Sequence, residues 1–433
     1  MTPRADTQLV AIEKPVYGGS FLARIGGKAV FVPLTLPGEQ ARIRITQSKA
    51  GFSNAEAEEI AAAAPERIAP ACPHFGVCGG CHYQHADYKT QLAFKQAILR
   101  ETLERGGVAV PEQIHVLASD PWHSRNRIRL AFDAAGNPGY RGRRSHAVIP
   151  VSECPIAAPL LLDAARTAAE IARQLSPPLR ISEIALFCNA EESSLLASVF
   201  TASAKKTRFD EFAQAWQQRI PALKGAELVA EGRAGQTGRT VARWGESSIT
   251  YRAAGFDYRV DHGSFFQVNR WLVDALVDRV AAGRRGALAW DLFAGVGLFA
   301  RRLTSGFARV GAVESAPAAT KALAANLKGT RGIPIRAATL DFLRRGLEGK
   351  YPEMAVPDFI VVDPPRTGLG AEIAAILGEI AAPALAYVSC DPATLARDLR
   401  ALAGSGYQIE SVTLADLFPQ TFHLETVVHL RRA

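Results

Sequence analysis

The chain has 433 residues, of which 48% are hydrophobic and 21% charged, and its formal net charge is +8. This length exceeds one ordinary core, so we expect two or three domains, and the composition excludes a disordered chain. No apolar run reaches the roughly 18 residues of a membrane span, and the N-terminus lacks the apolar core of a signal peptide. We therefore expect a cytoplasmic protein, and its positive charge suits a polyanionic partner.

Residues 8–61 are predicted to form short strands. The segments "LVAIEKPV", "SFLARIG", "KAVFVPL" and "EQARIRITQ" are separated by Gly18-Gly19, Gly26-Gly27 and Pro37-Gly38. Short strands with such turns favour a small β-barrel of the oligonucleotide-binding type. The segment that follows, "AEAEEIAAAAPERIAP", is predicted to be a linker.

Four of the six cysteines have metal-ligand spacing. Cys72, Cys78 and Cys81 lie in "ACPHFGVCGGCHYQH", and Cys154 lies in "SECPIAAP". In a reducing compartment such a cluster favours a metal site over disulfides. Four thiolates suit zinc and an iron–sulfur cluster equally, so the spacing leaves both open. Three histidines nearby are further candidates for zinc: His74, His82 and His85.

Residues 84–106 have apolar positions at helical spacing and end in Gly106-Gly107, which predicts a helix. Residues 122–154 alternate as strands around the turn "DAAGNPGYRG". In "SRNRIRLAF", Arg125, Arg127 and Arg129 share one face of a strand, so we predict that they contact RNA phosphates. The alternative is a solvated edge strand.

Aromatic side chains suited to stacking on an unpaired base are Tyr140, Phe265 and Phe266, and Phe265 is our candidate for RNA binding. Core packing is the expected role of at least one of them.

From about residue 262, strands alternate with helices, which predicts an α/β domain with a mainly parallel sheet and a ligand at the carboxyl ends of its strands. The turn in "DLFAGVG" lets the backbone approach a nucleoside closely. Three acids are predicted at or near the ends of successive strands: Glu314, Asp341 and Asp363. Together they fit S-adenosylmethionine better than a dinucleotide, since the turn lacks the full G-x-G-x-x-G order. The alternative is that these acids cap helices.

Cys390 follows the apolar strand "ALAYVS" and precedes a predicted helix, whose N-terminus would stabilise a thiolate. Glu425 lies in an apolar stretch, where a carboxylate is costly unless it has a partner or a task. A thiol, a buried carboxylate and a methyl donor together suggest methylation of a pyrimidine at C5. The thiolate would attack C6, and a base would then remove the proton from C5.

Six motifs carry a resemblance to a known family: "CPHFGVCGGCHYQH", "GSFFQVN", "DLFAGVG", "DPPRTG", "VSCDPATLARDL" and "HLETV". With them the chain resembles the RNA (uracil-5-)methyltransferases over essentially its whole length. It is most similar to the branch that has an N-terminal TRAM domain and an iron–sulfur cluster and modifies large-subunit (23S) ribosomal RNA.

The resemblance implies a role for each site residue. Cys390 is the nucleophile and Glu425 is the base. The contacts to S-adenosylmethionine are Gln267, Phe293, Glu314, Asp341 and Asp363. The ligands of a four-iron four-sulfur ([4Fe-4S]) cluster are Cys72, Cys78, Cys81 and Cys154. Leu298 stands where the family often has Asn, so that position is not carried over.

The expected architecture is therefore an OB-like TRAM barrel, a central α+β domain with the cluster, and a Rossmann-like class I methyltransferase domain. The barrel covers 1–61, the central domain 62–83 and 117–260, and the methyltransferase domain 84–116 and 261–433. The expected substrate is ribosomal RNA, with tRNA second, and the expected oligomeric state is a monomer. The alternatives are an RNA cytosine-5-methyltransferase and a non-catalytic RNA-binding iron–sulfur protein.

Overall fold

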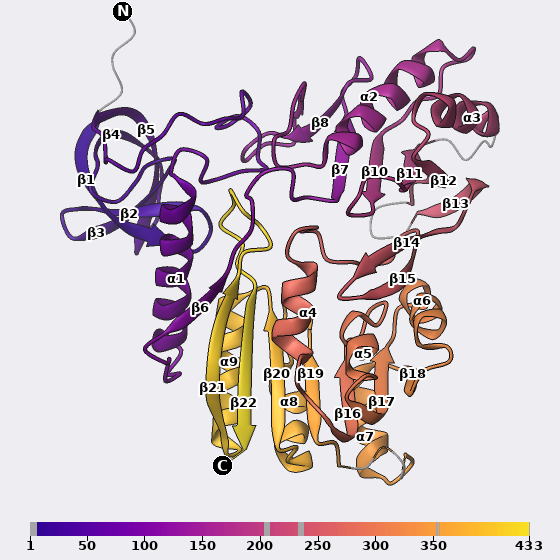
Figure 1. Cartoon of the computed structure of the whole chain (residues 1–433). Coiled ribbons are helices and arrows are strands. Elements are labelled where there is room, and N and C mark those ends of the chain that lie inside the picture. The colour runs from indigo at the N-terminus through magenta and orange to yellow at the C-terminus, as the bar shows by residue number, and fades with distance from the viewer. Residues whose placement is uncertain (1–6, 203–207, 233–237, 352–353, 355, 433) are drawn as a thin grey trace, which may run out of the picture.

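The computed structural model describes residues 7–202, 208–232, 238–351, 354 and 356–432. It consists of a closed barrel, a seven-stranded sheet, a two-stranded hairpin and an eight-stranded sheet. Figure 1 shows the barrel and the seven-stranded sheet side by side above one end of the eight-stranded sheet. Within these ranges, no helix is both long and apolar enough to cross a membrane.

The barrel is built from five strands in the order β1-β2-β3-β5-β4. Their bounds are β1 (Gln8–Val16), β2 (Ser20–Ile25), β3 (Lys28–Pro33), β4 (Gln40–Ser48) and β5 (Phe52–Ala62). The predicted linker is wrong over residues 55–62, because this segment belongs to β5 and pairs with β4. The first part of β5 alternates buried and half-buried residues, as is typical of a barrel strand.

The seven-stranded sheet has the order β13-β12-β11-β10-β7-β8-β9, and two helices pack on its apolar face. Its elements are β7 (Arg127–Phe132), β8 (Pro138–Arg141), β9 (Val148–Pro150), α2 (Pro159–Gln174), β10 (Glu183–Cys188), β11 (Leu195–Thr201), α3 (Phe209–Arg219), β12 (Leu223–Ala230) and β13 (Arg239–Gly245). The hairpin of β14 (Ser248–Ala253) and β15 (Phe256–Asp261) follows along the chain.

The eight-stranded sheet has the order β18-β17-β16-β19-β20-β22-β21-β6. Its strands are β6 (Ile114–Leu117), β16 (Gly286–Leu292), β17 (Phe307–Glu314), β18 (Gly332–Arg336), β19 (Phe359–Val362), β20 (Ala384–Ser389), β21 (Tyr407–Ala415) and β22 (Thr426–Arg432). All neighbours are parallel except β22, which is antiparallel to both β20 and β21. This mainly parallel sheet agrees with the strand–helix alternation of the sequence.

Helices cover both faces of this sheet. One apolar cluster contains residues of α4 (Val273–Ala281), α5 (Leu298–Leu303) and α6 (Pro317–Leu327). The other contains residues of α1 (Tyr88–Arg105), α7 (Thr339–Leu347), α8 (Gly370–Ile380) and α9 (Pro392–Gly404). The result is a three-layer arrangement, with strands buried on both faces.

Helix α1 and strand β6 precede the seven-stranded sheet along the chain but pack on the eight-stranded sheet. Asp87 caps α1 by accepting a hydrogen bond from the backbone N–H of Thr90 at 2.8 Å, and Gly106 follows its last residue. A Cβ at Gly106 would lie 2.6 Å from the Cβ of Ala396, so only glycine lets α1 approach α9 this closely. The helix thereby runs from the cysteine loop (residues 72–85) to the edge of the large sheet.

Candidate active site

Cys390 and Glu425 lie opposite each other, just beyond the paired ends of two antiparallel strands. The last paired residues of β20 and β22 are Ser389 and Thr426. Cys390 comes directly after Ser389, and Glu425 directly before Thr426, so the two stand opposite each other at the carboxyl end of β20. Cys390 is partly exposed, whereas Glu425 is 5% exposed.

The electrostatics around Cys390 disfavour its thiolate in the ligand-free protein. Burial and the nearby carboxyls of Glu425 and Asp363 together raise the pKa of Cys390 to about 11, whereas Arg366 acts in the opposite direction. Helix α9 begins where predicted, but Asp391 caps it, accepting backbone hydrogen bonds from Ala393 and Thr394 at 3.0 Å each. The expectation that the free helix N-terminus stabilises the thiolate is therefore wrong, because a carboxylate occupies that position.

Asp363 is the common neighbour of the acids at this edge. It follows β19 directly, and burial raises its pKa to about 7. Burial and the neighbouring Asp363 carboxyl together raise the pKa of Glu425 well above its ordinary value. Two neighbouring carboxyls that both favour their neutral forms are prepared for a cationic ligand or for proton transfer.

The glycine turn after β16 brings further acids to the same edge. Glu314 accepts a hydrogen bond from the Gly295 backbone at 2.9 Å and two more from the start of α6, at 2.7 Å each. Glu314 thus holds the glycine turn and the segment before α6, whereas α6 itself has no side-chain cap hydrogen bond. Gly297 has a φ of 90°, which favours glycine.

Asp291 was not predicted as a site residue, although it opens "DLFAGVG". It is fully buried, and one carboxylate oxygen accepts a hydrogen bond from the Ala300 backbone at 2.7 Å. Its other oxygen has no partner among the described residues. Burial and the neighbouring acids Asp363 and Glu314 raise its pKa to about 8. The sequence did contain a signal for Asp291, namely an acid at the end of an apolar strand and directly before a glycine turn.

The remaining predicted cofactor residues lie on three different segments of the chain. Phe293 follows β16 with a φ of 65° and packs partly into the apolar core. Gln267 is 6% exposed in the loop between β15 and α4. Asp341 is exposed in the first turn of α7. We expected it at or near the end of β18, but α7 begins only three residues after that strand. Leu298 is buried in the core, which accounts for an apolar residue there.

The three arginines of the predicted stripe lie in different environments, and Arg127 is not available to contact phosphates. Asn126, Ile128 and Leu130, which alternate with the arginines, are buried. Arg127 is also withdrawn from solvent, since it donates to the Ser264 carbonyl at 2.8 Å and lies 4.4 Å from the centre of the Phe187 ring. Burial lowers its pKa to about 10. Arg127 therefore supports the loop that carries Phe265 and Gln267.

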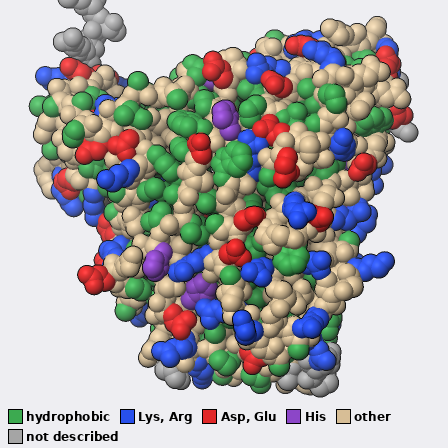
Figure 2. All heavy atoms as spheres, in the orientation of Figure 1, with side chains coloured by type: hydrophobic (Ala, Val, Ile, Leu, Met, Phe, Trp, Pro, Cys, Tyr) green, Lys and Arg blue, Asp and Glu red, His purple; other side chains and the backbone are tan. Residues whose placement is uncertain are grey.

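The other two arginines have separate environments. Arg129 is 62% exposed and pairs with Glu183. Arg125 lines the cavity of the cysteine cluster. On the face shown in Figure 2, basic side chains are interspersed with acidic ones and do not form one continuous patch.

The aromatic candidates divide as expected. Phe266 is 2% exposed, and its ring centre lies 4.5 Å from that of Tyr251 in the core. The neighbouring Phe265 is 62% exposed, which leaves its ring free to stack on a ligand. Tyr140 lies near the cysteines, with its hydroxyl 3.8 Å from the Cys154 sulfur.

All four predicted metal ligands line one cavity of about 40 Å³. Burial raises the pKa of all four thiols, that of Cys81 to about 12. Across the described ranges, however, no three His, Cys, Asp or Glu side chains are gathered closely enough to hold a single metal ion. As four thiols, the donor set is chemically suited to a soft metal.

The barrel also reaches the residue next to Cys390, which the sequence did not indicate. The hydroxyl of Tyr17 lies 3.5 Å from a carboxylate oxygen of Asp391, the residue after Cys390. Its ring packs edge-on against Phe422, with 5.6 Å between the ring centres. A Cβ at Gly19 would lie 2.8 Å from His82, so this turn docks closely on the cysteine loop.

Comparison with known proteins decides the family. A protein of Chromohalobacter salexigens, "23S rRNA (uracil(1939)-C(5))-methyltransferase RlmD", is 34% identical over 98% of this chain and 89% of its own length. This chain belongs to the RNA uracil-5-methyltransferase family. An RlmD of Halomonas elongata is 31% identical over 97% of this chain and 89% of its own length.

The family models agree with this assignment. The description "tRNA (Uracil-5-)-methyltransferase" matches residues 344–433, and the TRAM domain matches residues 4–57. The closed five-stranded barrel is thus a TRAM domain. The crystal structure of a Pyrococcus abyssi tRNA (uracil-54, C5)-methyltransferase with S-adenosyl-L-homocysteine covers 98% of this chain and 100% of its own, with a TM-score of 0.77. At 22% identity, this likeness establishes the fold.

As a member of this family, the enzyme is S-adenosylmethionine-dependent and modifies RNA. The described residues fit that cofactor: the glycine turn, the neighbouring acids Asp291, Glu314 and Asp363, and an Asp291 oxygen with no partner among the described residues are of the kind that suits a cationic sulfonium and ribose hydroxyls.

Proposed function

We propose that the enzyme methylates C5 of a uridine in 23S rRNA, with Cys390 as the nucleophile and Glu425 as the base. The observation that carries this proposal is their placement directly opposite each other beyond the last pair of β20 and β22. A nucleophile for C6 and a base for C5 must reach adjacent atoms of one ring, and this register supplies both.

S-adenosylmethionine supplies an electrophilic methyl group when bound. Cys390 adds to C6 as a thiolate, which forms the S–C6 bond and makes C5 nucleophilic. C5 takes the methyl group, and the sulfonium becomes a neutral thioether. Glu425 then removes the proton from C5, the C5–C6 double bond re-forms, and the Cys390 thiolate leaves.

Two observations support a ribosomal substrate. The curated relatives named for 23S rRNA match this chain over nearly its whole length at 31–34% identity. The TRAM barrel contacts Asp391, the residue after Cys390, through Tyr17, which suits recognition of an RNA that spans both domains. Transfer RNA is the second candidate, since the solved structure with this fold is named for tRNA.

A cytosine-5-methyltransferase is disfavoured because that chemistry in RNA uses two active-site cysteines. Cys188, which is not among the predicted ligands, is fully buried in β10 of the seven-stranded sheet. Cys390 thus has no second thiol within the described active site.

The decisive assay combines the protein, labelled S-adenosylmethionine and transcripts of 23S rRNA or tRNA, followed by digestion to nucleosides. We expect label in 5-methyluridine from 23S rRNA, lost in Cys390→Ala. Label from tRNA alone would show that the substrate is tRNA and not 23S rRNA. Label in 5-methylcytidine would contradict the uridine reaction, and RNA binding without any transfer would favour the non-catalytic alternative.

We further propose that Cys72, Cys78, Cys81 and Cys154 hold a [4Fe-4S] cluster. Four thiols that line one cavity are a suitable donor set for such a cluster, and the family resemblance favours iron–sulfur over zinc. Anaerobic purification should yield about four iron and four sulfide per chain. The Cys72→Ser variant should lose them and Cys188→Ser should not, and stoichiometric zinc would overturn the proposal.

A further inference from the structure

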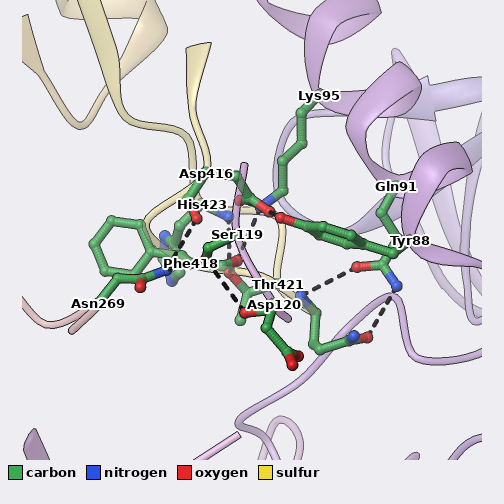
Figure 3. Close-up of polar contacts among 11 residues, drawn as sticks. Tyr88, Gln91, Lys95, Ser119, Asp120, Asn269, Asp416, Phe418, Thr421 and His423 are labelled. Atoms are coloured by element: carbon green, nitrogen blue, oxygen red, sulfur yellow. Dashed lines mark hydrogen bonds and ion pairs between the residues drawn. The ribbon is translucent and has the colours of Figure 1, made fainter. Parts of the chain in front are cut away.

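A buried ion pair joins helix α1 to the segment between β21 and β22, residues 416–425, which we call the base loop because it ends in Glu425. Lys95 Nζ lies 2.5 Å from a carboxylate oxygen of Asp416, and both side chains are 0% exposed. Lys95 also donates to the Phe418 carbonyl at 2.9 Å, and the Tyr88 hydroxyl donates to the other oxygen of Asp416 at 2.9 Å. Figure 3 shows these side chains converging on the base loop.

Gln420 is a second junction in the middle of the base loop. It is 2% exposed and has a φ of 66°, a left-handed conformation that is unfavourable for a residue with a Cβ. Its amide forms a reciprocal pair with Gln91 of α1: the Gln91 side chain donates to the Gln420 side-chain oxygen at 2.9 Å and accepts from the Gln420 backbone at 3.1 Å. The Gln420 carbonyl accepts backbone hydrogen bonds from His82 and Tyr83 of the cysteine loop.

Both ends of the base loop are also fixed. The Ala415 backbone donates to the Glu425 carbonyl at 2.8 Å, and the Asp416 backbone donates to the Leu117 carbonyl at 2.8 Å. Asn269, from the loop that carries Gln267, donates to the Asp416 carbonyl at 3.3 Å. The base loop is therefore held by α1, the cysteine loop and the cofactor-side loop together.

We propose that Tyr88, Gln91 and Lys95 of α1 are positioning residues for Glu425, holding the base loop so that its carboxylate meets the proton on C5. A buried ion pair adds little net stability compared with well-packed apolar residues, so its main effect here is to fix geometry. This inference rests on the proposed function, in which Glu425 acts only in the last step.

Loosening the base loop should therefore separate the two halves of the reaction. Cys390 lies on the other strand, so the S–C6 bond still forms and C5 still takes the methyl group. Without a positioned base the C5 proton stays, the S–C6 bond does not break, and a covalent protein–RNA adduct accumulates. General destabilisation would lower adduct and product together.

The test uses the full-length protein with 23S rRNA transcript and S-adenosylmethionine, and measures denaturation-resistant adduct and 5-methyluridine in the same reaction. Gln91→Leu removes the reciprocal pair, and Tyr88→Phe removes one hydroxyl with minimal disturbance of folding. Gln96→Leu is the matched control, since Gln96 lies on the same helix but donates to the Ile114 carbonyl, away from the base loop. Glu425→Gln is the reference for a missing base.

We expect Glu425→Gln to give the highest adduct-to-product ratio and Gln91→Leu to raise it about tenfold or more, since small misplacements cost up to about 100-fold in rate. Tyr88→Phe should raise it less, and Gln96→Leu should leave it at the wild-type value. If Glu425→Gln accumulates adduct but Gln91→Leu and Tyr88→Phe match Gln96→Leu, the positioning role is wrong. If Glu425→Gln itself accumulates none, the proposed base is wrong instead.

Discussion

Cys390 and Glu425 stand opposite each other, one residue beyond the last antiparallel pair of β20 and β22. They are separated by 35 positions in sequence, yet the strand register makes them neighbours, and the charge of Glu425 contributes to the raised pKa of Cys390. The register of these two strands thus brings the two proposed reacting groups together.

This placement predicts a difference between two conservative variants. Cys390→Ala should abolish both 5-methyluridine and adduct, whereas Glu425→Gln should abolish turnover but retain the adduct, because only the final proton removal needs the carboxylate. Gel electrophoresis under denaturing conditions with labelled RNA distinguishes them. Adduct formation by Cys390→Ala would assign the nucleophile elsewhere.

The reactivity of Cys390 should depend steeply on pH in the absence of ligands. Because its pKa is raised to about 11, the thiolate fraction at neutral pH is small and grows about tenfold per pH unit. Carboxymethylation of the Cys390 peptide, followed by mass spectrometry from pH 7 to about 9.5, should rise throughout this range. Glu425→Gln should shift the profile to lower pH, and a plateau below pH 9 in the wild type would contradict the raised pKa.

Asp291 should make folding stability fall with rising pH. Its pKa is about 3.9 in an unfolded chain and about 8 in the folded protein, so its stabilisation is complete below the first value and is lost as pH rises through the second. Asp291→Asn should therefore gain stability relative to the wild type between about pH 4 and pH 8. Urea unfolding at several pH values measures this difference, and a difference independent of pH would contradict a raised pKa.

Phe265 and Phe266 are adjacent but should behave oppositely. Phe265→Ala should change the free energy of unfolding by less than about 0.5 kcal/mol, because its ring is exposed. It should weaken RNA binding by about 1–3 kcal/mol if the ring stacks on a base. Phe266→Ala should cost about 3–5 kcal/mol of folding stability. Unchanged RNA affinity in Phe265→Ala would remove this residue from the RNA site.

Because the Lys95–Asp416 pair is buried, removal of one partner should lower the folding stability strongly. Lys95→Met leaves Asp416 charged and unpaired, and should cost about 3–5 kcal/mol in urea unfolding. The double variant Lys95→Met/Asp416→Leu should recover a large part of that loss. Lys14 and Glu101 form a matched exposed pair at 2.7 Å, where Lys14→Met should cost less than about 1 kcal/mol. Equal costs for the two single variants would contradict the buried geometry.

Local patterns predicted the larger features well and the particular contacts poorly. Strand–helix alternation indicated the parallel sheet, and the cysteine spacing indicated a site shared by four thiols, which line one cavity in the structure. Most of the last barrel strand is predicted as a linker, because residues 55–62 are alanine and glutamate apart from one β-branched residue, Ile60. Arg127 has the spacing of an exposed stripe, yet the loop of residues 264–269 covers it, and spacing along one strand cannot show what packs over it.

The base loop illustrates the same limit. Lys95 and Asp416 are more than 300 residues apart, and nothing in either local sequence marks them as a pair. The acid that caps α9 was visible as Asp391, but its effect on Cys390 depends on geometry that the sequence does not contain. The family resemblance supplied the roles of Cys390 and Glu425, whereas the strand register that brings them together came from the structure.

The most direct test of the reacting pair uses RNA with 5-fluorouridine at the target, because fluorine at C5 cannot be removed as a proton and the adduct is trapped. Protein, this RNA and S-adenosylmethionine should give a covalent complex whose methylated nucleotide maps by mass spectrometry to the peptide containing Cys390. A complex mapped to another cysteine, or no complex from a protein that still makes 5-methyluridine in unmodified RNA, would contradict the account.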